Sequence, residues 1–268
     1  MLLEFAKGHG TRNDFVLFAD PDNLLDLTAE QVAFLCDRRG GVGGDGILRA
    51  VRANQVPEWS GEPDVWFMDY RNADGSIAEM CGNGVRVFLR YLEEEGLVTG
   101  ERVSVATRAG LRTGRFLPDG RIAVTMGPVT RGAQVQLTVG AGSWPATSVD
   151  VGNPHAVAEL ETDAQLEGLD LTIAPAWEPA GAFPNGVNAE FVVREAPGHL
   201  RLRVHERGVG ETESCGTGVV AAAVASGHSD HCTVEVIGGT LEVDLTGPEA
   251  VLIGPAVVVA RGTCLLPT

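Results

Sequence analysis

The chain carries the same four-residue signature twice, as Cys81-Gly82-Asn83-Gly84 and as Cys215-Gly216-Thr217-Gly218, half of the 268-residue length apart. An apolar run of helical character follows each signature, so each cysteine is predicted to lie where a helix begins. Unpaired backbone N–H groups and the helix dipole favour negative charge at such a point, and a thiol there can have a lowered pKa. Two such thiols suit proton-transfer chemistry. The alternative is that both cysteines are small apolar residues that pack two helix starts.

The same order of elements surrounds both signatures. A strand-like stretch and a polar turn precede each cysteine, and a helix and two further strands follow it. Glu206 lies as far before Cys215 as Asn72 lies before Cys81, so the repeat extends into the turns. The run 219–225 is apolar on every side, which requires burial all round. We therefore expect an α+β protein of two homologous domains, each a curved, mainly antiparallel sheet wrapped around a central helix.

The crossover between the two domains is expected in the segment 127–133, which contains Pro128 and Gly132. This predicts an N-terminal domain over residues 1–128 and a C-terminal domain over residues 129–256. The last strand-like segment, within residues 257–268, is expected to return to the first strand and so to join the N-terminal domain.

Composition narrows the class of protein. A formal charge of −16 and a pI near 4.7, without any basic run, argue against a nucleic-acid partner, because such binding needs clustered Lys and Arg. No apolar run reaches the roughly 18 residues of a membrane span. Five cysteines without a secretion signal indicate reduced thiols and a cytoplasmic protein. Lys7 is the only lysine, which disfavours a pyridoxal enzyme; we expect no cofactor.

Two other motifs resemble known binding sites, one for a dinucleotide and one for zinc. The segment 41–46 fits the glycine pattern of a dinucleotide site, but that pattern must leave a strand and open a helix. Here a helical segment leads into the glycines and a strand-like segment leaves them, so the nucleotide interpretation is rejected. His228, His231 and Cys232 lack a fourth zinc ligand at finger-like spacing, so a polar turn with one packed cysteine and no metal is predicted. Cys36 and Cys264 are interpreted as core residues.

At this point the chain resembles the diaminopimelate epimerase family, whose members are pyridoxal-independent amino-acid epimerases. The segments that carry the resemblance occur in the family's order: 10–15, 72–76, 78–86, 152–155, 186–188 and 206–218. The resemblance implies two homologous domains, a homodimer, and conversion of LL-2,6-diaminopimelate to the meso isomer on the route to lysine and peptidoglycan precursors.

The resemblance also implies roles for individual residues. Cys81 would be the acid and Cys215 the base, with the roles exchanged in the reverse direction, and His155 and Glu206 would tune the thiols. The implied substrate-binding residues are Asn13, Asn72, Gly82, Asn83, Asn153, Asn188, Glu206, Arg207, Gly216 and Thr217. One departure is Gly46, which stands where many members have glutamine, so a side-chain contact is lost or replaced there.

The two thiols have a mechanistic rationale. Inverting a stereocentre by proton transfer needs a base on one face of the carbon and an acid on the other. Without a pyridoxal group, the carbanion must be stabilised electrostatically, and two helix starts aimed at the α-carboxylate would do so.

Two alternative functions stay open from the sequence. The first is another cofactor-independent racemase of the proline racemase kind, which also uses paired cysteines. The second is a thiol-disulfide switch or a non-catalytic binding module, although the chain has no Cys-x-x-Cys pair.

Overall fold

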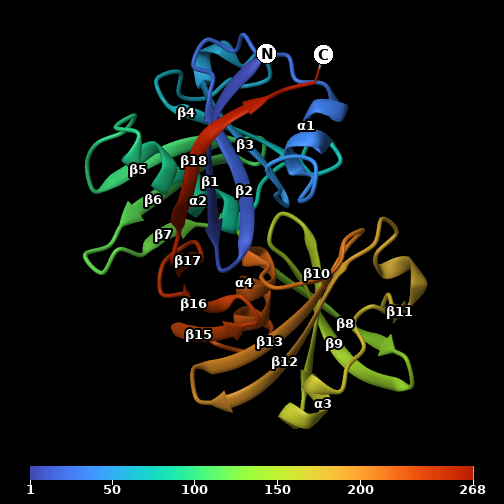
Figure 1. Ribbon diagram of the computed structural model, residues 1–268. Helices are drawn as coiled ribbons and strands as arrows, with labels where there is room; N and C mark the ends of the chain where they lie inside the picture. Colours follow the sequence, from blue (N-terminus) through green and yellow to red (C-terminus); the bar gives the residue numbers. More distant parts are fainter. Residues whose placement is uncertain (268) are drawn as a thin grey trace. The chain divides into compact units, whose positions relative to one another are not determined.

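The computed structural model describes residues 1–267, and the chain in it forms two compact units. Unit 1 comprises Met1–Val124 and the C-terminal segment that begins at Gly254, and unit 2 comprises Thr125–Ile253. Each unit contains one long helix and many strands, coloured blue to green with red in unit 1 and green to orange in unit 2 (Figure 1).

Unit 1 is a single sheet in the strand order β18-β1-β2-β3-β4-β5-β6-β7. Its elements are β1 (Leu2–Gly10), β2 (Asn13–Ala19), α1 (Ala29–Cys36), β3 (Gly46–Arg52), η1 (Ala53–Gln55), β4 (Trp66–Asn72), α2 (Gly82–Glu94), β5 (Arg102–Thr107), β6 (Gly110–Phe116), β7 (Ile122–Thr125) and β18 (Val257–Leu265). Neighbouring strands are antiparallel except for the parallel pairs β2–β3 and β4–β5. As expected from the sequence, the last strand returns to pair with the first.

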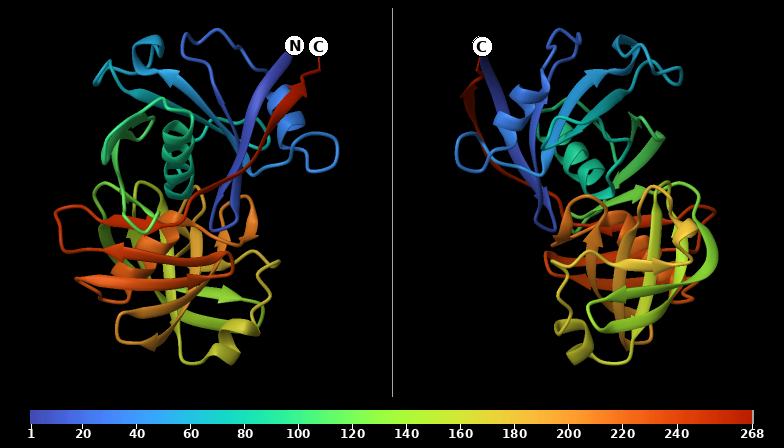
Figure 2. Two further views of the ribbon diagram at one scale, coloured as in Figure 1. Left: turned by 60° about the vertical axis from the view of Figure 1, so that its left-hand side comes forward. Right: turned by 90° about the vertical axis from the view of Figure 1, so that its right-hand side faces the viewer.

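Helix α2 lies inside the curve of this sheet, with strands on several sides in both views of Figure 2. Its residues 82–89 are all buried. The side chains packed around it form one apolar core that includes Phe15, Leu48 and Phe88. The helix is therefore held by tertiary packing more than by its own propensity.

Unit 2 repeats the arrangement in the strand order β11-β8-β9-β10-β12-β13-β15-β16-β17. Its elements are β8 (Thr130–Val139), β9 (Gly142–Asp150), β10 (Pro154–Leu160), α3 (Asp163–Glu167), β11 (Ala176–Glu178), η2 (Ala180–Ala182), β12 (Asn188–Ala196), β13 (His199–Glu206), β14 (Gly210–Thr212), α4 (Gly216–Ala225), β15 (His231–Val236), β16 (Gly239–Asp244) and β17 (Val251–Gly254). The parallel pairs are β10–β12 and β13–β15, and all other neighbours are antiparallel.

The two units therefore share one topology. Strands β1 to β7, with their helices α1 and α2, correspond in order and direction to β9, β10, β12, β13, β15, β16 and β17, with α3 and α4. β18 takes in unit 1 the place that β8 takes in unit 2, beside the first strand of the repeat. Helices α1 and α3 even begin alike, each with a threonine–glutamine capping box.

Some local expectations were wrong. The polar turn expected before Cys215 contains the short strand β14, which pairs with the end of β13. Cys232 does not lie in a turn but in β15, where it is buried. Both differences arise because a neighbouring strand supplies hydrogen-bond partners that local sequence does not reveal.

Candidate active site

Each signature cysteine is the N-cap residue of the long helix of its unit. Cys81 precedes α2 and Cys215 precedes α4, and both have extended backbone angles. The sulfur of Cys81 accepts a hydrogen bond from the backbone N–H of Gly84 at 3.4 Å, and that of Cys215 accepts one from Gly218 at the same distance. The predicted placement of both cysteines at helix starts is thus confirmed, and each sulfur occupies the site where a helix favours negative charge.

In unit 1, the sulfur of Cys81 faces an amide oxygen. Its thiol donates to Oδ1 of Asn13 at 3.4 Å, and Nδ2 of the buried Asn83 donates to the same oxygen at 3.4 Å. The orientation of this amide is fixed from the other end, because Nδ2 of Asn13 donates to a carboxylate oxygen of Asp45 at 2.7 Å. A carboxylate only accepts, so Asn13 must turn its oxygen toward Cys81.

Asp45 belongs to a small cluster of charges. Arg38 donates to both Asp14 and Asp45, and Lys7 forms an ion pair with Asp14. Burial acts to raise the pKa of the Asp14 carboxyl, but hydrogen bonds from Arg38 and Lys7 outweigh it and hold that pKa well below its usual range. Burial, together with the Asp14 carboxylate, raises the pKa of Asp45. Asp45 is thus the weaker acid of the two, and the hydrogen bonds that it accepts from Asn13 and from the backbone N–H of Asp14 oppose this increase.

Arg86 anchors the other side of this site. Its side chain is 0% exposed, and burial lowers the pKa of its guanidinium to about 10. Nη2 donates to Oδ1 of Asn83 at 2.8 Å, and Nη1 donates to the carbonyl of Gly82 at 3.3 Å. Because a guanidinium only donates, it fixes the amide of Asn83 with its NH₂ group toward Asn13. Arg86 is therefore a packing and orienting residue behind the helix start.

In unit 2, a series of hydrogen-bonded polar side chains leads to the other sulfur, and all of them except the half-buried Asn153 are buried. Sγ of Cys215 lies 3.4 Å from Oγ1 of Thr217, to which Nδ2 of Asn153 donates at 3.4 Å. Oδ1 of Asn153 is 3.0 Å from Nε2 of His155, and Nδ1 of His155 is 2.6 Å from Oε1 of Glu190. His155 and Glu190 are both 0% exposed. The structure thus brings together four predicted site residues and one that was not predicted, Glu190.

The thiol of Cys215 is in a different electrostatic setting from an exposed cysteine. Burial raises its pKa well above the usual value, and the carboxylates of Glu206 and Glu190 act in the same direction. The hydrogen bonds from Thr217 and Gly218 oppose this increase. The thiolate of Cys215 is consequently a strong base when it forms.

The strand register shows which residues of unit 1 and unit 2 occupy corresponding positions. Phe15 of β2 pairs with Gly46 of β3, and His155 of β10 pairs with Asn188 of β12, at corresponding points of the repeat. Asn13 thus corresponds to Asn153, Phe15 to His155, and Leu48 to Glu190.

The glycines inside the helix starts confirm this correspondence. A Cβ on Gly84 would lie 3.5 Å from both Phe15 and Leu48, whereas a Cβ on Gly218 would lie 2.6 Å from Oε1 of Glu190. We call the side chains packed beneath each helix start its floor. The floor of unit 1, Phe15 and Leu48, is apolar, and the floor of unit 2 is the hydrogen-bonded pair His155 and Glu190.

Three further predicted site residues lie at strand ends. Asn72 ends β4 and donates to Ser76 at 3.0 Å. Asn188 begins β12, where its Oδ1 accepts from the backbone N–H of Arg207 at 3.0 Å. Glu206 ends β13 and accepts from the hydroxyl of Thr212.

Gly46 stands opposite Asn72 at the start of β3. A Cβ there would lie 2.4 Å from the carbonyl oxygen of Arg71 and 2.8 Å from the ring of Tyr70. The backbone leaves no room for a larger residue, so the side-chain contact of a glutamine is lost at this position in the chain as it folds here.

Comparison with known proteins identifies the family of this chain. The chain matches the family model described as Diaminopimelate epimerase over residues 5–132 and 147–259. The chain belongs to the diaminopimelate epimerase family. The diaminopimelate epimerase of Streptomyces coelicolor is 50% identical over 275 residues, which cover 97% of this chain and 94% of that protein. That of Thermobifida fusca is 50% identical over 269 residues, covering 97% of each.

Solved structures share the fold at low identity. A phenazine biosynthesis protein of the PhzF family from Bacillus anthracis matches with a TM-score of 0.68 and 17% identity, covering 99% of this chain and 100% of that one. A hydroxyproline epimerase from Agrobacterium vitis matches with a TM-score of 0.64 and 15% identity, covering 98% and 92%. The α+β fold expected from the sequence, with helices enclosed by mainly antiparallel sheets, is therefore confirmed as that of the diaminopimelate epimerase family.

The motifs set aside in the sequence have ordinary places in this family member. Helix α1 leads into the glycine segment 41–46 and β3 leaves it, the order that rejects a dinucleotide site. All five cysteines are free thiols, and burial raises the pKa of both Cys36 and Cys232 to about 11. Within residues 1–267, no helix is long and apolar enough to cross a membrane.

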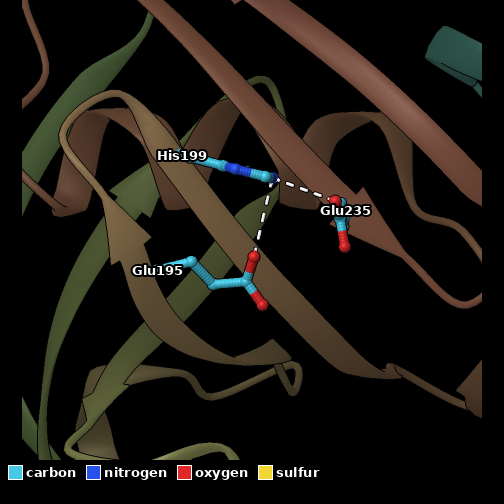
Figure 3. Close-up of side chains that lie close together, drawn as sticks. All are labelled: Glu195, His199 and Glu235. Atoms are coloured by element: carbon cyan, nitrogen blue, oxygen red, sulfur yellow. Dashed lines mark hydrogen bonds and ion pairs between the residues drawn. The ribbon is translucent and has the colours of Figure 1, made fainter.

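One exposed cluster lies apart from the cysteine sites. Nε2 of His199 is 3.1 Å from Glu235 and 3.8 Å from Glu195 (Figure 3), so three side chains of metal-ligating types lie close together. The residues come from the β12–β13 hairpin and β15, at its strand ends. All three are at least partly open to solvent, so a surface ion-pair network accounts for their arrangement.

Proposed function

We propose that the protein interconverts LL- and meso-2,6-diaminopimelate without a cofactor, as an isomerase of lysine and peptidoglycan-precursor synthesis. The observation that carries the proposal is the pair of N-cap cysteines, Cys81 and Cys215, in matching geometry in a chain of this family. The relatives named above are diaminopimelate epimerases, and this chain aligns with nearly their whole length.

In the proposed reaction, the two thiols exchange protons with one carbon. The thiolate of Cys215 takes the α-proton of the LL isomer from one face, and the thiol of Cys81 gives a proton to the opposite face. Each turnover leaves Cys215 protonated and Cys81 as thiolate, so the charge on the pair is conserved and the reverse reaction exchanges the roles. The proposal requires the two sulfurs to flank the reacting carbon.

The contacts at the two sulfurs support this assignment of acid and base. Cys81 donates to the amide oxygen of Asn13, a contact that only the protonated thiol can make. Cys215 lies beside a hydroxyl and a backbone N–H, both able to donate to a thiolate. The raised pKa of Cys215 suits a base that must remove a very weakly acidic proton.

The carbanion needs stabilisation by fixed dipoles. We assign this to the backbone N–H groups of Gly82-Asn83 and Gly216-Thr217 at the two helix starts. Asn13, Asn72, Asn153, Asn188 and Arg207 are proposed to hold the amino and carboxylate groups of the substrate, and Glu206 the ammonium at the reacting carbon. His155 and Glu206 are proposed to tune the thiols.

We also propose that the enzyme is a homodimer in the cytoplasm. Exposed apolar side chains on the paired strands β1 and β18, among them Leu2, Val257 and Val259, support a contact surface there. Light scattering after gel filtration should give twice the chain mass of 28.1 kDa; the chain mass alone would contradict the dimer.

A stereochemical assay tests the proposed activity. The purified protein is kept under a thiol reductant and given LL-diaminopimelate, meso-diaminopimelate or L-proline, and the isomers are separated by chiral chromatography. We expect the two diaminopimelate isomers to interconvert and proline to stay unchanged. Racemised proline without diaminopimelate turnover would favour the proline racemase alternative, and redox cycling without any epimerisation would favour a thiol switch.

A further inference from the structure

The buried pair His155–Glu190 has no counterpart in unit 1, where Phe15 and Leu48 take the same positions. Burying a carboxyl group is costly unless it is paired and hydrogen-bonded. Oε2 of Glu190 is buried without a hydrogen-bond partner, while Oε1 lies 2.6 Å from His155. The pair sits against Gly218 in the first turn of α4, directly behind Cys215.

We propose that Glu190 is a positioning residue that acts through His155, Asn153 and Thr217 to aim a hydroxyl donor at the sulfur of Cys215. The inference rests on the proposed function, because it concerns the thiol assigned there as the base.

The donor and acceptor in each hydrogen bond between Glu190 and Cys215 follow from which groups carry a hydrogen. Oδ1 of Asn153 only accepts, so Nε2 of His155 must carry a hydrogen. Nδ1 then shares a single proton with Glu190, and the pair is neutral overall whichever atom holds that proton. Glu190 thereby prevents His155 from turning its bare nitrogen toward Asn153.

The same logic continues to the sulfur. With its oxygen bound to His155, Asn153 directs its NH₂ group at Oγ1 of Thr217. That oxygen accepts, so the hydrogen of the Thr217 hydroxyl is left to point at Sγ of Cys215. In unit 1 the polarity is opposite, since Asp45 draws the NH₂ group of Asn13 away and leaves an acceptor at Cys81.

The ionisable groups around Cys215 come from three strands packed on α4. Glu206 approaches from β13, Glu190 from β12 and His155 from β10. The buried side chains of the other strands packed on α4 carry no charge; they are Ala146, Thr147, Val149, Cys232, Val234, Leu241 and Val243.

The test compares two replacements of Glu190. Glu190→Gln removes the charge but can still donate to Nδ1 of His155, whereas Glu190→Leu removes the contact and installs the residue that unit 1 carries. Alkylation of Cys215 by iodoacetamide is followed against pH by mass spectrometry of digests, with Cys81 in the same samples as internal reference and Glu159→Gln, a change at an exposed glutamate, as control.

We expect the midpoint pH for Cys215 to rise by about one unit in Glu190→Leu, a tenfold loss of thiolate, because a hydrogen bond to a charged group is weakened. In Glu190→Gln and in the control it should stay within about half a unit, since both keep the chain of donors. The Cys81 midpoint should not change in any of them.

Two results would overturn the proposal. One is an unchanged or lower midpoint in Glu190→Leu, which is what removal of a bare negative charge would produce. The other is an equal shift in the Gln and Leu variants.

If Glu190→Leu does not fold, as judged by circular dichroism, the double change His155→Phe with Glu190→Leu recreates the floor of unit 1. It must give the same upward shift. The measurement uses no substrate, so a protein that failed to act on diaminopimelate would still decide this point.

Discussion

The two cysteine sites share a backbone and differ in almost everything that surrounds it. Both sulfurs cap a helix and accept an N–H three residues on. Beneath Cys81 lie Phe15 and Leu48, and an amide oxygen faces its sulfur. Beneath Cys215 lie His155 and Glu190, and a hydroxyl faces its sulfur.

This difference teaches how a duplicated element acquires two roles. The helix dipole is common to both sites, so it cannot decide which sulfur holds the proton. We propose that the surrounding side chains decide it, because they present an acceptor at Cys81 and a donor at Cys215. The side chains that differ are Phe15 and Leu48 against His155 and Glu190, Asn83 against Thr217, and Asp45, which orients Asn13.

The largest effect is expected from removing either sulfur. Cys81→Ala and Cys215→Ala should each lower the rate of epimerisation by about 10²- to 10⁴-fold, the contribution of a general acid or a general base. Chiral chromatography of the diaminopimelate isomers measures the loss. Full activity in either single variant would show that the two sites do not act as a pair.

A smaller effect is expected from removing the carboxylate that orients Asn13, the hydrogen-bond acceptor at Cys81. Asp45→Ala removes the carboxylate that orients Asn13, so kcat/KM should fall about tenfold, the order of one hydrogen bond to a charged group. Arg38→Ala is the matched control, because it leaves the contact between Asp45 and Asn13 in place, and it should change kcat/KM less than about threefold. Equal losses in both variants would mean that the charge cluster as a whole, and not the orientation of Asn13, matters.

The two floors should also respond differently to one added methyl group. Gly218→Ala places a Cβ 2.6 Å from Glu190, and overpacking of this kind should lower the free energy of unfolding by about 1–3 kcal/mol. Gly84→Ala meets Phe15 and Leu48 at 3.5 Å, and its tighter contact, with Cβ of Cys81 at 3.3 Å, is one that Gly218→Ala also makes with Cys215. Stability should therefore stay the same or rise by up to about 1 kcal/mol. Denaturant titration compares the two, and equal changes would contradict the difference in packing.

The smallest effect concerns alkaline stability. Burial raises the pKa of Cys232 in unit 2 to about 11, above the value of about 8.5 for an unfolded chain. The neutral thiol is therefore favoured by folding, and its contribution is complete below pH about 8.5 and is lost as the pH rises toward 11. Cys232→Ala should show a shallower loss of stability than the unchanged protein between pH 8.5 and pH 10.5, measured by denaturant midpoints; parallel curves would contradict this.

The sequence was sufficient for the features that depend on local pattern. The glycines after each cysteine and the apolar runs that follow them predicted both helix starts, and the repeated order of elements predicted the fold. These signals are local, because capping and helical periodicity act within a few residues.

Features that depend on strand register could not be predicted. Glu190 approaches Cys215 because β12 pairs with β10, and Asp45 reaches Asn13 because β3 pairs with β2. A single charge inside the otherwise apolar run 189–193 was a signal for Glu190, but only pairing with β10 shows which side chain it meets. The loss of the glutamine contact at Gly46 likewise depends on the carbonyl of Arg71 in the neighbouring strand.

Turnover of LL-diaminopimelate in D₂O tests most directly whether two different groups act on one carbon. The reaction is stopped at low conversion, and both isomers are analysed by mass spectrometry. A thiol base and a separate thiol acid predict one deuterium in the meso product and none in the recovered LL substrate. Equal label in substrate and product at early times would mean that one group both removes and returns the proton, and would contradict the account.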